Sequence, residues 1–549
     1  MRKIVSILCS AVLLCGVASA ERFDSGGLII DPSTITAFDM FNTGRIELTM
    51  GTARSAAMAG AMTSLGADAS SMVINPAGMG MYRSNEITIT PMLTFNSSST
   101  NANSFEGDRK NRFAVGNWGL VAKIRESSTG VMAVNMGFTY TRLSDYNYKY
   151  SFSTAGQMGN ASIADVYAGQ LEAAGVSSSQ LKSSYDRDNN FSWGSFDPTY
   201  WGAILGYKAG LINDVSGRWG RDMIGSNARI DGPTTVESSG SAGEWTWSIG
   251  VNVNSKFYVG ASIGVATMKR ERHIYYGESY YYSSEPNINY RMDYFNYDQI
   301  ANMKGTGVNF KIGAIYRPIE ALRIGVAFHT PTYYNIVYSY QGGMTSQVKA
   351  LNNVDNYQVD ANGYINPPFS NSTILLIDDG EYSWTYTTPA RLLVGASYTF
   401  AKQFILSVDY QRDWYNGMRL KDSPYGDGLY KEYIKESFKG SNTIRVGAEW
   451  RVIPQIAIRM GYSLWDGGLN DAKSVYSSPV IYRTEYMSAG FGIALSKNIS
   501  LDATYSYSTN KLTPYKTFYG YDSMVDFASP TFETSFSRHT AMLTLGLHF

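Results

Sequence analysis

Cysteine is nearly absent from the sequence, and the two that exist, Cys9 and Cys15, stand close to its start. Both fall inside Met1 to Ala20, which has the basic start, apolar centre and Ala-x-Ala site of a secretory signal. Removal of that signal leaves an exported chain without disulfides, a thiolate nucleophile or a cysteine metal site. An alternative interpretation makes Cys15 a lipoprotein anchor, but Leu14 is bulkier than the residue that usually precedes one.

Long apolar runs and an excess of charge are also missing. No stretch after Ala20 has the roughly 18 consecutive apolar residues that a membrane-spanning helix needs. Basic and acidic residues balance at 46 each, so the chain lacks the basic footprint of a nucleic-acid-binding protein. Aromatic residues, by contrast, make up 14% of the chain and glycine numbers 53, which is typical of a large soluble β protein or a transmembrane barrel.

Signatures of catalysis are scarce. A hydrolase-like Gly-x-Ser-x-Gly string runs from Gly260 to Gly264, but that motif requires a strand-to-helix turn and here it lies within an alternating strand. We interpret it as a stripe of small residues facing a lumen. The four histidines show no helical pairing and no His-Glu-x-x-His motif. The sequence therefore predicts no enzyme, no cofactor and no catalytic metal.

One acidic string matches part of the sequence pattern of a calcium-binding loop. Asp186, Asp188 and Asn190 have the spacing of calcium ligands, but Phe191 stands where that loop needs glycine and the closing glutamate is missing. A solvated acidic turn is the simpler interpretation, and a calcium site is the alternative.

From Glu86 onward the chain becomes a series of segments with a period of two, one face apolar and the other small or polar. In the last of them Ala541, Leu543, Leu545 and Leu547 share a face with the terminal residue Phe549. A chain that stops on an aromatic residue in such a strand is typical of bacterial outer-membrane barrels. Ionised groups recur on one face only, as expected if that face lines a lumen and the other meets lipid.

The connections alternate between short and long, as periplasmic turns and external loops do in outer-membrane barrels. The longest, from Ser151 to Gly243, combines a helical pattern over Ala161 to Ser183 with many aromatic residues, which indicates an external cap. The segments themselves number about fourteen, an even count as single-chain bacterial barrels require.

The stretch from Gly51 to Pro91 differs from everything that follows. It is small and glycine-rich up to the turn Asn75–Gly78, so its composition indicates a compact plug of short helical turns ahead of the sheet. It also resembles the N-terminal hatch of the FadL/OmpP1/TodX family of outer-membrane transport proteins, through Gly51, Ala53, Arg54, Met58, Gly60, Asp68-Ala69-Ser70 and Asn75-Pro76-Ala77-Gly78. The segments Lys311–Pro318, Leu322–Pro331, Thr388–Gly395 and Asp409–Trp414 look like the middle of that family's barrel.

We therefore predict an all-β fold, a transmembrane antiparallel β-barrel of about 14 strands with an N-terminal hatch inside the lumen and long extracellular loops. The predicted boundaries are 1–20 for the signal peptide, 21–85 for the N-terminal extension and hatch, and 86–549 for the barrel, with a cap insert around 151–243.

The resemblance implies uptake of hydrophobic molecules, long-chain fatty acids above all, across the outer membrane of a Gram-negative bacterium. In the family, cargo enters the barrel, the hatch moves, and the cargo leaves sideways beside a kinked third strand. The candidate hatch residues are Arg54, Asn75, Pro76 and Ala77, with Arg54 as an anchor to the wall. The third strand is predicted at Val131–Tyr140, where Asn135 and Gly137 are expected to weaken pairing.

Cations on the predicted lumen face are candidates for holding a carboxylate. Among Lys311, Arg323, Arg391, Arg445, Arg451 and Arg459, we single out Arg323, Arg445 and Arg459 as ligand-binding residues. The alternative is a structural charge ladder with Asp409, Glu449 and Asp502.

The expected partners are a hydrophobic, fatty acid-like small molecule and the surrounding outer-membrane lipid and lipopolysaccharide. A second hypothesis is a non-transporting scaffold or accessory barrel of a secretion or assembly complex. Its outer-membrane protein partners would dock on the cap insert, which is otherwise a lid.

Overall fold

The structure is a computed structural model, and it describes residues 37–101, 107–154, 158, 161–184, 191–196, 200–352, 358–365, 372–375, 382–421, 431, 434–472, 479–518 and 529–549. The predicted signal segment and the string from Asp186 to Asn190 lie outside these residues. Of the helices within the described ranges, none has both the length and the apolar character needed to cross a membrane.

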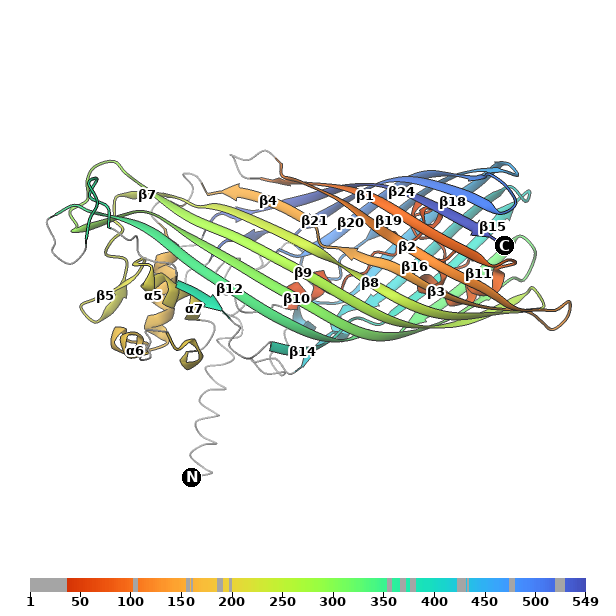
Figure 1. Ribbon diagram of the computed structural model, residues 1–549, viewed down its shortest axis with the longest axis horizontal. Helices are drawn as coiled ribbons and strands as arrows, with labels where there is room; N and C mark the ends of the chain where they lie inside the picture. Colours follow the sequence, from red (N-terminus) through yellow and green to blue (C-terminus); the bar gives the residue numbers. More distant parts are fainter. Residues whose placement is uncertain are drawn as a thin grey trace, which may run out of the picture.

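Fourteen antiparallel strands close on themselves as a barrel, as predicted (Figure 1). Closure comes from the pairing of the first strand with both the second and the last. In order around the wall the strands are β1 (Glu86–Thr100), β2 (Arg109–Glu126), β3 (Val131–Asp145) with its continuation β4 (Tyr148–Ser153), β8 (Pro233–Val253), β9 (Phe257–Tyr282), β10 (Tyr290–Tyr316), β11 (Leu322–His329) with β12 (Tyr333–Ala350), β14 (Tyr382–Thr387) with β15 (Arg391–Phe400), β16 (Phe404–Trp414) with β17 (Arg419–Lys421), β18 (Gly440–Ile453), β19 (Ile456–Trp465), β20 (Ile481–Ala494), β21 (Ile499–Leu512) and β24 (Thr534–His548).

The strands expose large apolar side chains on their outer face and bury polar ones on their inner face. On β18 the exposed residues Ile444, Val446 and Trp450 alternate with the buried Arg445 and Glu449. Because this alternation recurs around the wall, the barrel has an outer belt suited to hydrocarbon and a polar lumen.

One side of the barrel is much taller than the rest. Strands β8, β9, β10 and β12 run past their neighbours to the end opposite the C-terminus and carry the cap there (Figure 1). The described cap elements are α5 (Ile163–Ala173), α6 (Ser178–Ser183), η2 (Trp193–Ser195), α7 (Trp201–Lys208), β5 (Asn213–Val215), β6 (Arg218–Gly220) and β7 (Ala228–Asp231). The cap is narrower than the predicted 151–243, since Pro233–Gly243 already belongs to β8 and Ser151–Ser153 to β4. These strand ends consist mainly of small and polar residues without an apolar face, so the sequence did not identify them as strands.

Inside the barrel lie the short helices of the hatch, α3 (Ala53–Ala57), α4 (Ser71–Ile74) and the 3₁₀ helix η1 (Pro76–Met81). A further helix, α2 (Ala37–Gly44), lies in the lumen on the outer side of the hatch, where Phe41 is fully buried against Tyr415, Phe438 and Trp465. The remaining described elements are β13 (Ser372–Leu375), η4 (Tyr415–Gly417), β22 (Tyr515–Lys516) and β23 (Thr531–Phe532).

Candidate functional site

The hatch rests against glycines that the barrel wall turns inward. A Cβ at Gly260 would lie 2.3 Å from the carbonyl carbon of Pro76, and one at Gly461 would lie 2.4 Å from the amide nitrogen of Ala59. A Cβ would also lie within 3.0 Å of hatch atoms at Gly250, Gly313, Gly325, Gly447 and Gly490, on five further strands. Absence of side chains at these positions therefore allows the hatch backbone to lie directly on the sheet.

The Gly-x-Ser-x-Gly string is part of the wall surface on which the hatch lies. Ser262 lies in the middle of β9, and its hydroxyl donates to the carbonyl oxygen of Met72 in the hatch at 2.9 Å. The Ser248 hydroxyl on β8 lies 2.9 Å from the same oxygen of Ser262, within hydrogen-bonding distance. The small residues of the string thus hold the hatch against the wall.

Asn75 ties the hatch turn both to itself and to the wall. Its side-chain oxygen accepts from the amide of Ala77 at 3.1 Å, and its amide group donates to the carbonyl oxygen of Thr63 at 2.6 Å. Longer contacts of 3.4 Å reach the carbonyl oxygens of Ala314 and Val326 on two wall strands. Pro76 opens η1 and, like Ala77, is fully buried.

Arg54 makes the charged contact between hatch and wall. Its Nε lies 3.0 Å from Glu449 on β18, and the same carboxylate accepts from Arg459 on β19 at 2.7 Å. The Glu449 carboxylate raises the pKa of Arg54, so the guanidinium stays charged although most of the side chain is buried. Arg459 also pairs with Asp502 on β21, which leaves its donors engaged in the wall.

Three other predicted lumen cations also pair with carboxylates, two closely and one at a longer distance. Lys311 pairs with Glu244 at 2.5 Å and Arg391 with Asp413 at 2.8 Å, two carboxylates that the predicted ladder did not include. Arg451 is 58% exposed, and its distance of 3.8 Å to Glu449 is longer than those of the other two pairs.

Of the two remaining predicted ligand residues, Arg445 lines a cavity. Arg445 is buried and donates from Nη2 to Gln411 at 2.6 Å, while its Nη1 has no hydrogen-bond partner within the described part of the chain. It lines a cavity of about 560 Å³ together with Arg45, Tyr415 and Trp465. Arg323 lies elsewhere, at the start of β11.

The third strand leaves the wall on the outer side of the hatch. Every residue from Thr141 to Asn147 is buried, whereas a strand in the wall exposes alternate side chains to lipid. The amide of Glu47 donates to the carbonyl oxygen of Leu143 at 2.7 Å, and the hydroxyl of Tyr146 donates to that of Thr43 at 2.6 Å. This segment therefore packs inward against the N-terminal stretch that follows α2.

Hydrogen bonding between β2 and β3 stops at this point. Their last pair toward the outside is Asn117 with Thr141, although β2 continues to Arg109 along β1 and β3 continues to Asp145 along β8. We call the unpaired stretch between 109–116 of β2 and 142–153 of β3 and β4 the wall gap. The predicted weak points were wrong, because Asn135 and Gly137 pair on both sides. Gly137 instead makes room for Met72 and Met79 of the hatch.

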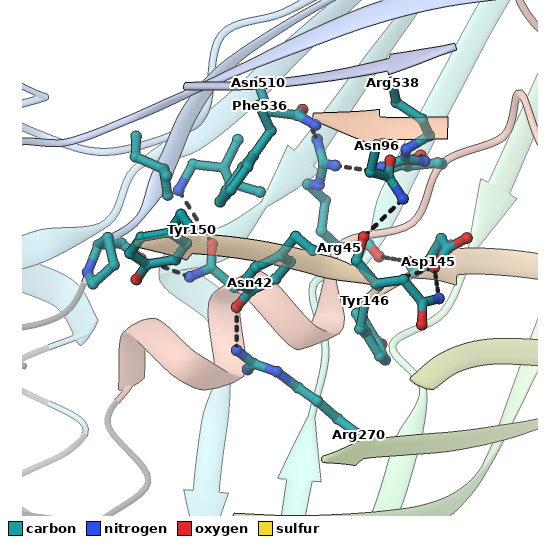
Figure 2. Close-up of a pocket in the computed structure, with 17 residues that line it drawn as sticks. Asn42, Arg45, Asn96, Asp145, Tyr146, Tyr150, Arg270, Asn510, Phe536 and Arg538 are labelled. Atoms are coloured by element: carbon teal, nitrogen blue, oxygen red, sulfur yellow. Dashed lines mark hydrogen bonds and ion pairs between the residues drawn. The ribbon is translucent and has the colours of Figure 1, made fainter. Parts of the chain in front are cut away.

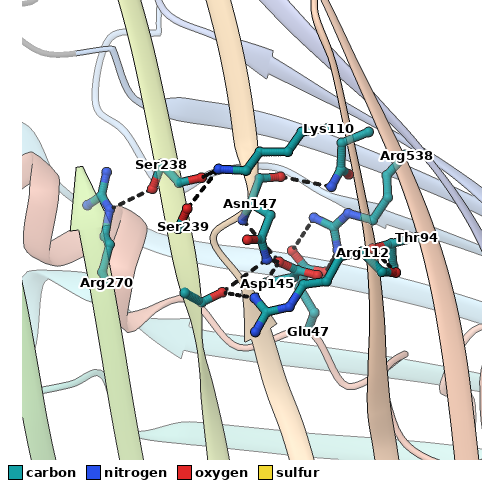
Figure 3. Close-up of polar contacts among 12 residues, drawn as sticks. Glu47, Thr94, Lys110, Arg112, Asp145, Asn147, Ser238, Ser239, Arg270 and Arg538 are labelled. Atoms are coloured by element: carbon teal, nitrogen blue, oxygen red, sulfur yellow. Dashed lines mark hydrogen bonds and ion pairs between the residues drawn. The ribbon is translucent and has the colours of Figure 1, made fainter. Parts of the chain in front are cut away.

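Two cations of β2 cross the wall gap (Figure 3). Lys110 donates to the Ser238 carbonyl oxygen at 2.8 Å and to the Ser239 hydroxyl at 2.7 Å. It also donates to Glu237 at 2.8 Å. Arg112 donates to the carbonyl oxygen of Gly240 at 2.8 Å. Polar side chains, not backbone pairs, therefore close the wall here.

A second cavity adjoins the gap from inside. Its free space is about 720 Å³ including a part open to solvent, and residues of the N-terminal stretch and of six wall strands line it, including Arg45, Asp145, Tyr150, Asn510 and Phe536 (Figure 2). Glu47 at its edge pairs with Arg538 at 2.7 Å and also with Arg45. Burial alone would raise the pKa of Glu47, but the two guanidinium groups outweigh it and lower the pKa.

Sequence reasoning missed Lys110, Arg112, Glu47 and Arg538. The available signal was the run Arg142 to Asn147. Polar residues stand on both faces of this strand, whereas a strand in the wall has an apolar face toward lipid. No group of three His, Cys, Asp or Glu residues in the described ranges is placed to hold a metal.

Comparison with solved structures shows the same fold at low sequence identity. A FadL homologue of Pseudomonas aeruginosa is 12% identical with a TM-score of 0.52, over 91% of this chain and 98% of that one. The toluene transporter TodX of P. putida is 10% identical with a TM-score of 0.50, over 90% of this chain and 97% of that one. A search of curated protein sequences finds no significant match.

The sequence model of the family described as outer membrane protein transport protein (OMPP1/FadL/TodX) matches residues 228–534, more than half of the 549 residues. Its members are outer-membrane barrels of Gram-negative bacteria that act as transporters and channels for hydrophobic compounds, not as enzymes. The chain belongs to this family.

Proposed function

We propose that the protein takes up hydrophobic molecules at its outer end and releases them sideways into the outer membrane through the wall gap. The observation that carries this proposal is the inward course of Thr141–Asn147, which ends backbone pairing between β2 and β3. Because lipid-facing backbone must be paired in a barrel, an unpaired stretch in the wall is costly and calls for a function.

The hatch favours a sideways route over an axial one. Its backbone lies directly on the glycines of the wall, and Arg54 joins it to Glu449. Movement of the hatch out of the bore would break this ion pair and would also expose the wall glycines on which the hatch lies. Among the described residues, the contacts across the wall gap are made by side chains, those of Lys110 and Arg112 and the 3.6 Å ion pair of Lys149 with Asp108.

A fatty acid-like cargo fits the free donor of Arg445. A guanidinium presents paired donors that match a carboxylate, and the Nη1 of Arg445 is buried beside a cavity with aromatic walls. Arg459 is committed to Glu449 and Asp502, so we assign it to the wall structure. Arg323 lines neither of the two cavities described above and is a weaker candidate.

Binding to the purified protein tests the cargo. We expect a fluorescent long-chain fatty acid to bind, and Arg445→Gln to weaken binding of the acid while leaving its methyl ester unchanged. Arg412→Gln is the matched control, since Arg412 donates to Asn442 rather than lining the cavity. Equal loss for acid and ester would contradict a carboxylate site at Arg445.

Uptake by whole cells tests transport itself. We expect a variant that replaces Asn75 and Pro76 to insert normally and to change uptake, because both residues fix the turn that seats the hatch. Unchanged uptake would count against a hatch-controlled barrel. Stable co-purifying proteins without bound hydrophobic cargo would favour the alternative, a scaffold that docks partners on its cap.

A further inference from the structure

Strands β9 and β10 present matched outward pairs from one border of the apolar belt to the other. Val259 faces Ala314, Ile263 faces Phe310 and Val265 faces Val308. The next outward pair is Thr267 with Thr306, and the one after it is Lys269 with Lys304. The two lysines are thus the first charged outward residues beyond the belt on the side that carries the cap.

This lysine pair lacks a counter-charge. Both side chains are exposed, and within the described chain neither ammonium group lies within 4.0 Å of a carboxylate. Glu271 stands two positions further along β9, opposite Asn302, and pairs with neither lysine. Like charges directly opposite each other on neighbouring strands repel, so the pair carries an energetic cost that an external anion would remove.

The position of the lysine pair along the barrel axis indicates which anion it binds. On β9 and β10 the apolar side chains that meet hydrocarbon end at Val265 and Val308, so ammonium groups two residue pairs beyond lie at the level of lipid head groups. The outer leaflet of this membrane contains lipopolysaccharide, whose lipid anchor carries phosphate groups at that level. Lysine binds phosphate as a point charge.

We propose that Lys269 and Lys304 bind the phosphate groups of an outer-leaflet glycolipid of the lipopolysaccharide type. Val337 faces Lys304 from β12, and hydroxyl and amide groups on the other sides of the pair can donate to the remaining phosphate oxygens. Ser241 faces Lys269 from β8, Thr267 and Thr306 form the pair below, and Asn302 lies above. Bound glycolipid would hold the tall side of the barrel at a fixed height, beside the wall gap.

Native mass spectrometry of the detergent-solubilised protein with added diphosphorylated lipid A tests this site. We expect Lys269→Gln with Lys304→Gln to weaken lipid A binding roughly 30-fold, the effect of losing two charges at an anionic surface. Lys269→Arg with Lys304→Arg keeps the charge and should bind like the parent protein. The control, Lys402→Gln with Lys497→Gln, removes two exposed lysines from turns at the other end of the barrel and should also leave binding unchanged.

Three results would overturn the proposal. These are parental binding by the double glutamine variant, an equal loss in the turn control, and equal binding of dephosphorylated lipid A or phosphatidylethanolamine by the parent protein. The shift in electrophoretic mobility on heating, which reports a folded barrel, must be kept by every variant that is compared.

Discussion

Arg112 on β2 donates to the carbonyl oxygen of Gly240 on β8 at 2.8 Å, although the third strand separates these two strands in the order of the wall. The contact exists because Thr141–Asn147 has moved inward and left the position between them. Side chains rather than backbone pairs therefore close the barrel at this height, and side chains can move aside without breaking the sheet.

Truncation of the two bridging cations should widen the wall gap. We expect Lys110→Ala with Arg112→Ala to increase uptake of a hydrophobic probe several-fold, because no other β2 side chain reaches Ser239 or Gly240 among the described contacts. The matched control is Lys123→Ala with Arg125→Ala, on the same strand but in its paired part. Uptake that stayed level or fell in the bridging variant would argue against the gap as the exit.

The glycine seat of the hatch predicts a steric effect. Gly260→Ala would push a methyl group to within 2.3 Å of Pro76, and such overpacking costs about 1–3 kcal/mol. We expect a lower unfolding temperature and faster proteolysis of the hatch. Gly417→Ala serves as the control, since a Cβ there meets nothing within 4 Å. Similar behaviour of the two variants would mean that the hatch does not rest on Gly260.

The buried Arg54–Glu449–Arg459 group predicts a large effect of neutralisation. Glu449→Gln leaves two guanidinium groups facing each other without their shared carboxylate, and breaking a buried pair costs roughly 3–5 kcal/mol. Denaturation in detergent should show this loss, whereas Glu285→Gln should have little effect, because Glu285 is a 59% exposed partner of Arg291. If the loss of stability is no greater than that of the control, Glu449 does not anchor the hatch to the wall.

The ion pairs of Glu47 predict a dependence on pH. Its pKa is lowered from the ordinary 4.5, so the charged carboxylate stabilises the folded state above pH 4.5. That contribution is lost as the pH falls from 4.5 through the lowered pKa. Thermal unfolding of Glu47→Gln should therefore differ most from the parent protein near neutral pH and converge with it in acid. A constant difference across this range would show that Glu47 acts through packing alone.

Sequence patterns identified the barrel because lipid imposes one rule on every strand. The outward series of β9 and β10 and the aromatic end at Phe549 follow from that rule, and so does the even strand number. The composition of Gly51–Gly78 identified the hatch for a similar reason, since only small residues allow its turns to lie against a sheet.

The wall gap could not be predicted, because its cause is a contact between distant segments. Leu143 and Tyr146 turn inward to meet Glu47 and Thr43, and neither stretch alone reveals the other. The expectation for Asn135 and Gly137 rested on local propensity, which pairing on both sides overrides. Inward cations such as Lys311 and Arg391 could be assigned to the lumen, but their partners Glu244 and Asp413 depend on register between strands.

Closing the wall gap by a covalent link tests the sideways route most directly. Lys110 and Ser239 meet at 2.7 Å across the gap, so Lys110→Cys with Ser239→Cys can be joined by a short, reducible bis-thiosulfonate linker. The control pair, Thr267→Cys with Thr306→Cys, links two strands that are already paired. We predict that linking the first pair lowers uptake of a hydrophobic probe, that reduction restores it, and that linking the control pair has no effect. Full uptake with the first pair linked would contradict the account.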